Sequence, residues 1–290
     1  MKKLMFALLA SAAMLSYADA QKDESKELEK QEAPLFWGFG NYGLYSGYQL
    51  YGSLLNNEPT LQGYVEGNIN LPGGFGYVGL GLWSNSDLTN RRRSGGLGQM
   101  FNEWDPNVHF GYTFWFDEDE AWGLDWRSSV VWYYYPAQDY KEMHPATDTT
   151  WDFDHSFALL NPYLIPYVNI VREYRFDANL FQFGIRKPIQ ITDDLSICPF
   201  IEMVARDSHY NWCFPTRFGA IDTCGGLATL KVELDATYKI TENFGLFAKV
   251  AYCSIIDHNM RNSCDDILAS DEYGENKDFA WGGVGVTFNF

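Results

Sequence analysis

The sequence predicts an all-β protein, a transmembrane antiparallel up-and-down β-barrel of about twelve strands. Three observations predict this fold: strand-length segments alternate apolar and polar residues, short turns alternate with long polar connections, and aromatic residues make up 17% of the 290 residues. Aromatic side chains favour strands. Short turns at one end and long loops at the other are typical of barrels in the outer membrane of Gram-negative bacteria.

The N-terminal residues predict export. Lys2 and Lys3 precede an apolar stretch, and the small residues of ADA, ending at Ala20, form a cleavage pattern, so residues 1–20 are expected to be a signal peptide. Residues 21–34 are charged and lack a strand pattern. We expect them to be a mobile N-terminal segment.

The barrel is expected over residues 35–290, where no uninterrupted apolar run is long enough for a membrane helix. The clearest strand covers residues 60–71, where Val65 and Ile69 lie on one face and Glu66 lies on the other. The same alternation recurs at residues 122–134, 178–191, 195–207 and 229–240. One face of each strand is thus suited to lipid and the other to a polar interior.

The spacing of the turns distinguishes a barrel from a soluble β-sandwich, whose strands also alternate. Short turns are expected at residues 71–74, 117–120, 192–194 and 241–243. Long polar connections are expected at residues 86–105, 136–149, 208–226 and 257–277. This asymmetry favours the barrel, with short periplasmic turns and long extracellular loops.

Twelve strands satisfy the even number that single-chain bacterial barrels require. Their predicted ranges are 36–51, 59–71, 75–85, 106–116, 122–134, 150–160, 163–173, 178–191, 195–207, 227–240, 244–254 and 278–290. The count depends on a hairpin near Asn161 and Pro162, and Pro166 interrupts the following strand. Ten strands is the alternative.

Two segments carry a resemblance to a known family. Residues 59–88, PTLQGYVEGNINLPGGFGYVGLGLWSNSDL, and residues 281–290, WGGVGVTFNF, resemble uncharacterised Gram-negative outer-membrane β-barrels described as porins. The resemblance implies a barrel in the outer membrane and brings no established substrate or catalytic residue. The last strand, with Val286, Phe288 and Phe290 on one face, also resembles the signal that the barrel-assembly machinery reads.

The polar face carries charges of both signs. The lumen-lining candidates are Glu66, Asp125, Arg127, Asp152, Asp154, Glu173, Arg186, Glu202, Arg206, Lys231, Glu233, Asp235, Lys239 and Lys249. Such charges either pair and fill a narrow interior or line a water channel that screens solutes. We expect a narrow porin-like channel for passive diffusion of small polar or charged solutes. The alternative is a non-transporting structural or adhesive surface barrel whose function lies in its extracellular loops.

The expected partners are outer-membrane lipid, lipopolysaccharide, the barrel-assembly machinery and small solutes. A formal charge of −17 argues against nucleic acid as a partner. A run of basic residues at 91–93 favours a solvated loop face over lipopolysaccharide binding or a constriction. No cofactor and no metal are expected, because the five histidines lack metal-ligand spacing and the acidic residues 264–275 match no calcium loop.

An enzyme is not expected. The minor alternative is an omptin-like surface protease, which would use Asp152 with Asp154 and Asp207 with His209 to activate water. A lipase would need a serine and a histidine together on the lipid-facing side, and the sequence gives no sign of such a pair.

Cysteine spacing is consistent with an oxidising compartment. Cys213 and Cys224 have the same spacing as Cys253 and Cys264, so two loop disulfides are expected. Four cysteines allow three pairings, so the connectivity is open. Cys198 is left over, and we expect it to be an unreactive thiol that faces the interior.

Overall fold

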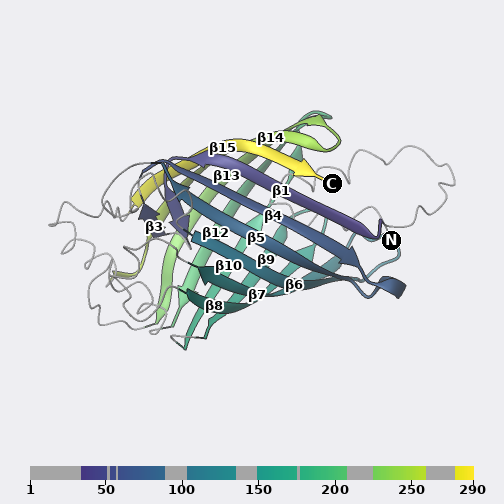
Figure 1. Cartoon of the computed structure of the whole chain (residues 1–290), viewed down its shortest axis with the longest axis horizontal. Coiled ribbons are helices and arrows are strands. Elements are labelled where there is room, and N and C mark those ends of the chain that lie inside the picture. The colour runs from purple at the N-terminus through teal and green to yellow at the C-terminus, as the bar shows by residue number, and fades with distance from the viewer. Residues whose placement is uncertain are drawn as a thin grey trace.

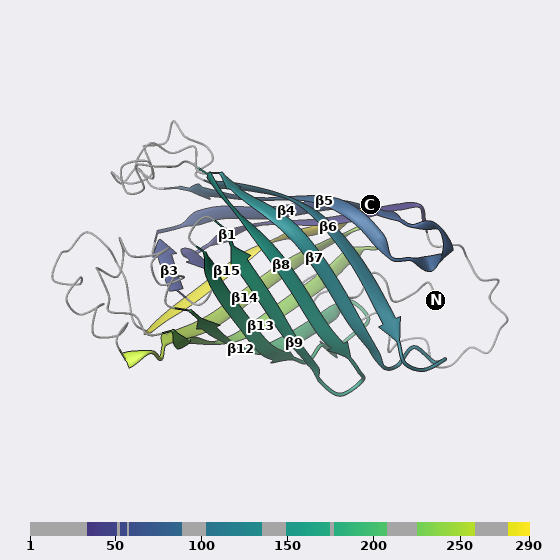
Figure 2. The ribbon, with the colours of Figure 1, turned by 90° about the horizontal axis from the view of Figure 1, so that it is seen from below.

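The computed structural model describes residues 34–50, 53–56, 58–88, 103–134, 149–174, 177–207, 225–258 and 278–290. These residues form a β-barrel (Figures 1 and 2). Its strands are β1 (Phe36–Tyr45), β2 (Tyr48–Leu50), β3 (Ser53–Asn56), β4 (Thr60–Asn70), β5 (Tyr77–Asp87), β6 (Glu103–Trp115), β7 (Gly123–Tyr134), β8 (Thr149–Leu160), β9 (Ile165–Glu173), β10 (Ala178–Arg186), β11 (Ile189–Gln190), β12 (Leu195–Arg206), β13 (Gly226–Thr241), β14 (Phe244–Ile255) and β15 (Asp278–Asn289). In the described part of the chain, no helix is long and apolar enough to cross a membrane.

The sheet closes on itself. Its order is β10-β9-β8-β7-β6-β5-β4-β1-β15-β14-β13-β12-β11, and β10 also pairs with β12. The short β11 continues β10 beyond Lys187 and Pro188, and both pair with β12. Proline has no N–H for the ladder, which accounts for the break. With β10 and β11 taken as one, the barrel has twelve strands, so the predicted fold is confirmed and the ten-strand alternative is wrong.

The last strand pairs with the first. The N–H of Phe290 donates to the carbonyl of Gly38 at 3.0 Å, and the N–H of Gly38 donates back at 2.9 Å. On the outer face, the rings of Phe288 and Phe290 lie where a side chain at Gly40 or Gly38 would otherwise be. These contacts leave no open edge between β1 and β15, as a barrel in lipid requires.

The hairpin between β8 and β9, on which the strand count depends, is held by one side chain. Asn161 Oδ1 accepts hydrogen bonds from the N–H groups of Tyr163 and Leu164, both at 3.0 Å. An asparagine side chain that bonds to the backbone two and three residues ahead stabilises a tight turn. The predicted turn near Asn161 and Pro162 is therefore confirmed.

The first strand is shorter than the predicted residues 36–51. β1 stops at Tyr45, and the chain bends before a separate small hairpin of β2 and β3. At the bend the carbonyl of Gly47 accepts hydrogen bonds from Trp281 Nε1 at 2.8 Å and Thr60 Oγ1 at 3.2 Å. Two buried side chains thus fix the bend, which the local alternation of residues did not indicate.

We call the end with the connections at 71–76, 116–122, 161–164, 191–194 and 242–243 the turn end, and the opposite end the loop end. The turn end and the C-terminus lie on the right in Figure 1. Long loops mark the extracellular end of outer-membrane barrels. The loop end is therefore the extracellular one.

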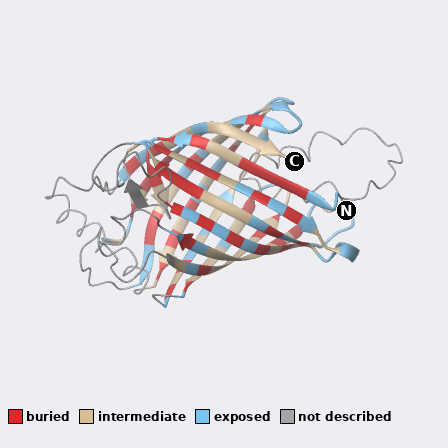
Figure 3. Cartoon of the chain, viewed as in Figure 1, coloured by how far each residue is buried: buried red, intermediate tan, exposed pale blue. Residues whose placement is uncertain are grey.

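The outer surface of the barrel is apolar. Large exposed side chains of the strands include Leu44, Val65, Ile69, Leu80, Val108, Val168, Phe181, Ile185, Ile201, Val232, Leu234, Leu246, Val250 and Val284. Exposed aromatic residues lie towards both ends: Trp104, Trp132, Tyr134, Trp151 and Tyr174 at the loop end, and Phe75, Phe116, Trp122, Tyr163 and Phe290 at the turn end. Buried and exposed residues alternate along the strands (Figure 3). An apolar band with aromatic girdles is the surface expected in a bilayer.

Candidate functional site

On the inner wall formed by β12, β13 and β14, acidic and basic side chains alternate without a break. We call this series the charge ladder: Glu202, Lys231, Glu233, Lys249 and Asp235. Lys231 Nζ lies 3.2 Å from Glu202 Oε1 and 3.5 Å from Glu233 Oε2. Lys249 Nζ lies 3.4 Å from both Glu233 Oε1 and Asp235 Oδ1. Each lysine thus lies between two carboxylates, and two lysines compensate two of the three negative charges.

Strand register sets the order of the ladder. Glu202 lies directly opposite Lys231, and Asp235 directly opposite Lys249. Opposite charges at facing positions of antiparallel strands stabilise the pairing. Glu202 also accepts hydrogen bonds from the Tyr167 hydroxyl and from Gln182 Nε2. The ladder is therefore held from several strands.

A second network spans β4 and β7, which are not adjacent strands. Arg127 Nη2 on β7 donates to Glu66 Oε2 on β4 at 2.8 Å, and the Tyr64 hydroxyl donates to the same oxygen at 2.6 Å. Asn68 Nδ2 donates to the other carboxylate oxygen of Glu66 at 2.8 Å, and Asn68 Oδ1 lies 2.7 Å from His109 Nε2. Both ring nitrogens of His109 have polar neighbours, Asn107 and Asn68, which is typical of a structural residue.

Glycines on β5 make this network possible. Strands β5 and β6 lie between β4 and β7. A Cβ at Gly79 would overlap Asn68 Oδ1 and His109 Nε2, and a Cβ at Gly81 would overlap the Tyr64 hydroxyl. Polar side chains from the neighbouring strands therefore occupy the space above β5. Here the requirement for glycine is one of space, since neither residue has a positive φ.

A third group of charges lies towards the loop end, on β6, β8 and β9. We call it the acidic wall: Glu103 and Asp105 on β6, Asp152 and Asp154 on β8, and Glu173 on β9. Asp152 lies directly opposite Glu173 in the pairing of β8 with β9. Thr150 Oγ1 donates a hydrogen bond to Glu173. The wall collects carboxylates from three strands on one side of the interior.

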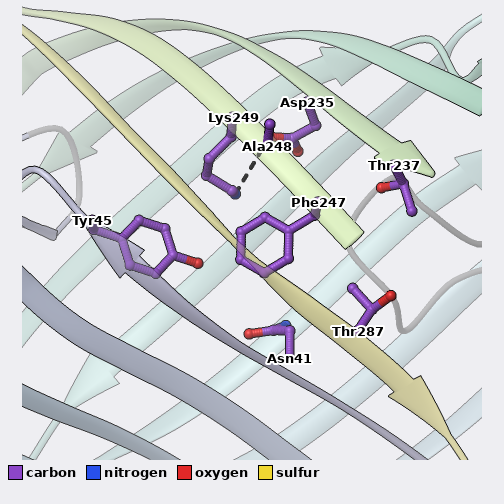
Figure 4. Close-up of a pocket in the computed structure, with 8 residues that line it drawn as sticks. All are labelled: Asn41, Tyr45, Asp235, Thr237, Phe247, Ala248, Lys249 and Thr287. Atoms are coloured by element: carbon purple, nitrogen blue, oxygen red, sulfur yellow. Dashed lines mark ion pairs between the residues drawn. The ribbon is translucent and has the colours of Figure 1, made fainter. Parts of the chain in front are cut away.

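Part of the interior is hollow. Residues from β1, β13, β14 and β15 surround about 340 Å³ of atom-free space, which includes open solvent. The lining consists of Asn41, Tyr45, Asp235, Thr237, Phe247, Ala248, Lys249 and Thr287 (Figure 4). The hollow therefore borders one end of the charge ladder, at the Lys249–Asp235 pair.

Aromatic and aliphatic side chains fill other parts of the interior. Trp37, Phe39 and Tyr77 pack together, with Tyr64 against them. A second cluster contains Ala158, Leu160 and Ile165, with Trp115 and Tyr167 against it. Most of these residues belong to the turn-end halves of their strands. They leave a narrow interior, as expected for a barrel between the filled eight-stranded and the open sixteen-stranded types.

The remaining lumen-lining candidates lie outside these three groups. Asp125 on β7 accepts a hydrogen bond from Thr113 Oγ1 at 2.9 Å. Arg186, at the end of β10, is acted on by the charges of Asp125 and of Asp235 in the ladder. Arg206 is buried at the loop end of β12, and Lys239 lies opposite Gly245 near the turn end. Sequence reasoning named these residues together, but the structure divides them among separate environments.

The structure assembles only half of the groups for an omptin-like protease. Asp152 and Asp154 lie two residues apart on β8. Asp207 Oδ2 accepts hydrogen bonds from the backbone N–H of Asn179 at 2.8 Å and from its Nδ2 at 2.6 Å, which ties together the ends of β10 and β12. His209 lies outside the described residues. A catalytic Asp–His pair is therefore not part of the site as described.

The expectation that no serine and histidine meet on the lipid-facing side was wrong. Ser128 on β7 lies directly opposite His155 on β8, and Ser128 Oγ is 2.6 Å from His155 Nδ1. Both residues belong to the outward-facing set of their strands, at mid-height in the barrel. The pairing of β7 with β8 decides this contact, and the two residues are 27 positions apart. Ester groups of lipids lie near the membrane surface rather than at mid-height, which disfavours a lipase site.

The cysteines differ from expectation at one position. Cys253 is a free thiol, buried in β14 beside Tyr45, Phe279 and Trp281, so the disulfide expected between it and Cys264 is not present. The residue belongs to the interior face of the strand rather than to the loop. Cys198 is also free and buried, in agreement with its expected place. Cys213, Cys224 and Cys264 lie outside the described residues, so the Cys213–Cys224 disulfide stays a prediction.

Comparison with known proteins finds barrels of very low sequence identity. No protein-family model matches the chain, and no curated protein matches it. The structure resembles the KdgM porin with 9% sequence identity and a TM-score of 0.45, over 87% of this chain and 99% of the porin. It resembles the NanC porin with 10% identity and a TM-score of 0.48, over 86% of this chain and 98% of the porin. It also resembles the outer membrane phospholipase A from Escherichia coli with 12% sequence identity and a TM-score of 0.44, over 87% of this chain and 92% of the phospholipase. This group includes channels and an enzyme, so the likeness does not choose between these functions.

The chain's own features give its location. A closed barrel removes the unpaired strand edges that lipid does not tolerate, and the outer face is apolar while the inner face is charged. The short turns and long connections have the expected asymmetry. The protein is therefore an outer-membrane β-barrel that crosses the bilayer with its strands.

Proposed function

We propose that the barrel is a narrow channel for passive diffusion of small polar or charged solutes. The observation that carries the proposal is that charged interior side chains keep contact with water. The exposed fraction of the side chain is 18% for Arg127, 17% for Lys249, 14% for Asp235 and 13% for Lys231. A fully packed interior would leave such groups without water, so these values support a narrow aqueous passage.

Charges of both signs along such a passage would screen solutes by charge and size. The charge ladder fixes its two lysines between three carboxylates, which leaves one negative charge uncompensated on that wall. The hydrophobic clusters near the turn end restrict the cross-section. We therefore expect a small conductance and exclusion of large solutes.

Single-channel recording tests this function. The mature chain, refolded and inserted into a planar bilayer, should give discrete steps in current. A folded barrel, verified by heat-modifiable migration in gel electrophoresis, that gives no steps would count against a channel. In that case a surface barrel that acts through its extracellular loops would become the better hypothesis, and deletion of residues 208–226 should abolish its activity.

Export and assembly are part of the same proposal. Residues 1–20 would direct secretion, and Val286, Phe288 and Phe290 would be read by the barrel-assembly machinery. These three residues lie on the outer face of β15 or directly after it, and Phe290 is 64% exposed. Replacement of Phe290 by Ser should reduce the amount of folded barrel in the outer membrane and leave the amount of exported precursor unchanged.

A further inference from the structure

Three carboxylates of the acidic wall, Asp105, Asp152 and Asp154, form no ion pair with a lysine or arginine in the part of the chain that the structure describes. Asp152 is 2% exposed and Asp105 is 6% exposed. Asp105 Oδ1, Asp152 Oδ1 and Asp154 Oδ1 lack a hydrogen-bond partner among the described residues. Buried polar atoms in folded proteins almost always have a hydrogen-bond partner, so three carboxylate oxygens without one in the same group indicate a site for a bound donor.

The described charges that act on Asp105 and Asp152 are negative. Glu103 and Asp152 act on Asp105, and Asp154 and Glu173 act on Asp152. Arg127 acts on Asp154, but its closest contact is the carboxylate of Glu66. The intervening strand β7 contributes the neutral Tyr133, which bonds to Asp152. Several ionised carboxylates buried together are costly unless protons or a cation neutralise them, and a bound cation lets them stay ionised.

The spacing of the carboxylates indicates the kind of cation. Within the described part of the chain, no three acidic, histidine or cysteine side chains come close enough to hold a metal ion. The wall instead spreads from β6 across β7 to β9, and neighbouring strands lie about 4.8 Å apart. Separate carboxylates several ångströms apart suit separate ammonium groups better than one metal ion.

We propose that the acidic wall binds an organic cation with two or more ammonium groups near the extracellular entrance, and that it makes the channel prefer cations. This inference rests on the proposed channel function and specifies its charge class. In the ladder on the opposite wall, two lysines compensate two of the three carboxylates, so the ladder attracts a cationic solute less than the acidic wall does. The acidic wall is the part of the described interior that distinguishes cationic from anionic solutes.

Direct binding tests the inference without the need for conduction. Spermidine is titrated by calorimetry into the full-length mature barrel in zwitterionic detergent at low salt. We expect saturable binding that weakens by at least about tenfold in D105N/D152N and that weakens with added salt. The matched control, D117N/E118Q, removes the same charge from the connection between β6 and β7 at the turn end, and its affinity should equal that of the unmodified chain. Absence of binding to the unmodified chain, or equal affinity in the two double variants, would overturn the inference.

A second measurement separates the two proposals. Under a potassium chloride gradient in a planar bilayer, the reversal potential should indicate preference for potassium, and D105N/D152N should shift it towards zero. Current steps with anion preference, or with a reversal potential that D105N/D152N leaves unchanged, would overturn cation preference and leave the channel intact. Spermidine binding without current steps would instead refute the channel and retain the site.

Discussion

The charge ladder and the acidic wall use the same residue types to opposite effect. In the ladder, each lysine lies between two carboxylates at 3.2 to 3.5 Å, on strands whose register places opposite charges face to face. In the wall, carboxylates from β6, β8 and β9 gather, and Asp105, Asp152 and Asp154 form no ion pair with a described lysine or arginine. We expect the first arrangement to stabilise the barrel. We expect the second to cost stability, and such a cost is typical of a functional site.

The largest change in stability is expected when an ion pair of the charge ladder is removed. Replacement of Lys231 by Met leaves Glu202 and Glu233 with one cation fewer, and loss of one partner from a buried ion pair costs about 3–5 kcal/mol. The urea concentration at half-unfolding in lipid vesicles should fall. Lys231→Arg keeps the charge and should unfold close to the unmodified protein. If K231M unfolds like the unmodified barrel, the ladder is not a stabilising element.

Crowding the second network should have a smaller effect. In Gly79→Val the new side chain would overlap Asn68 and His109, and overpacking of this kind typically costs about 1–3 kcal/mol. The decrease in the free energy of unfolding measures this cost. Gly67→Ala on β4 is the matched control, because a Cβ there has no atom within 4 Å. Equal losses in both variants would show that the glycine matters for strand conformation and not for the space it leaves.

Neutralising the wall should move stability in the opposite direction. Asp152→Asn removes one member of a like-charged group, which should raise the free energy of unfolding by on the order of 1 kcal/mol at low salt and by less at high salt. Urea unfolding at two ionic strengths measures the difference. A loss of stability at both salt concentrations would mean that Asp152 is a structural residue like those of the ladder.

The smallest effect is expected on the outer face. The Ser128–His155 hydrogen bond faces lipid, where polar contacts between membrane segments average about 0.6 kcal/mol. S128A/H155F replaces both partners by apolar groups and should change stability by less than about 1 kcal/mol, with conductance unchanged. A double-mutant cycle measures the coupling. A larger coupling, or lost conductance, would give this pair a role that its position does not indicate.

Most strand boundaries were predictable to within a few residues because the signal is local. Predicted residues 122–134 correspond to Gly123–Tyr134, and predicted residues 195–207 correspond to Leu195–Arg206. Alternation with a period of two assigns each residue to a face from its nearest neighbours alone. The prediction failed at the end of β1, where the bend depends on Trp281, which is distant in sequence.

The candidate site was predictable as a set of residues but not as an arrangement. The same alternation that placed Glu66, Glu202 and Asp152 on the polar face could not distinguish the three carboxylates. One bonds to Arg127 across two intervening strands, one pairs with a lysine on the next strand, and one belongs to a group of acids. The contacts of Ser128 and Cys253 likewise depend on which strands pair and in what register.

The sequence by itself determined twelve alternating strands and a polar inner face, because both follow from a short-range pattern of residues, and it predicts a signal peptide at residues 1–20. Only the tertiary structure decided which charges neutralise one another. The barrel places Glu66 of β4 beside Arg127 of β7 and puts the ladder and the wall on different strands. The energy of a buried charge depends on the partners within a few ångströms rather than on its neighbours along the chain.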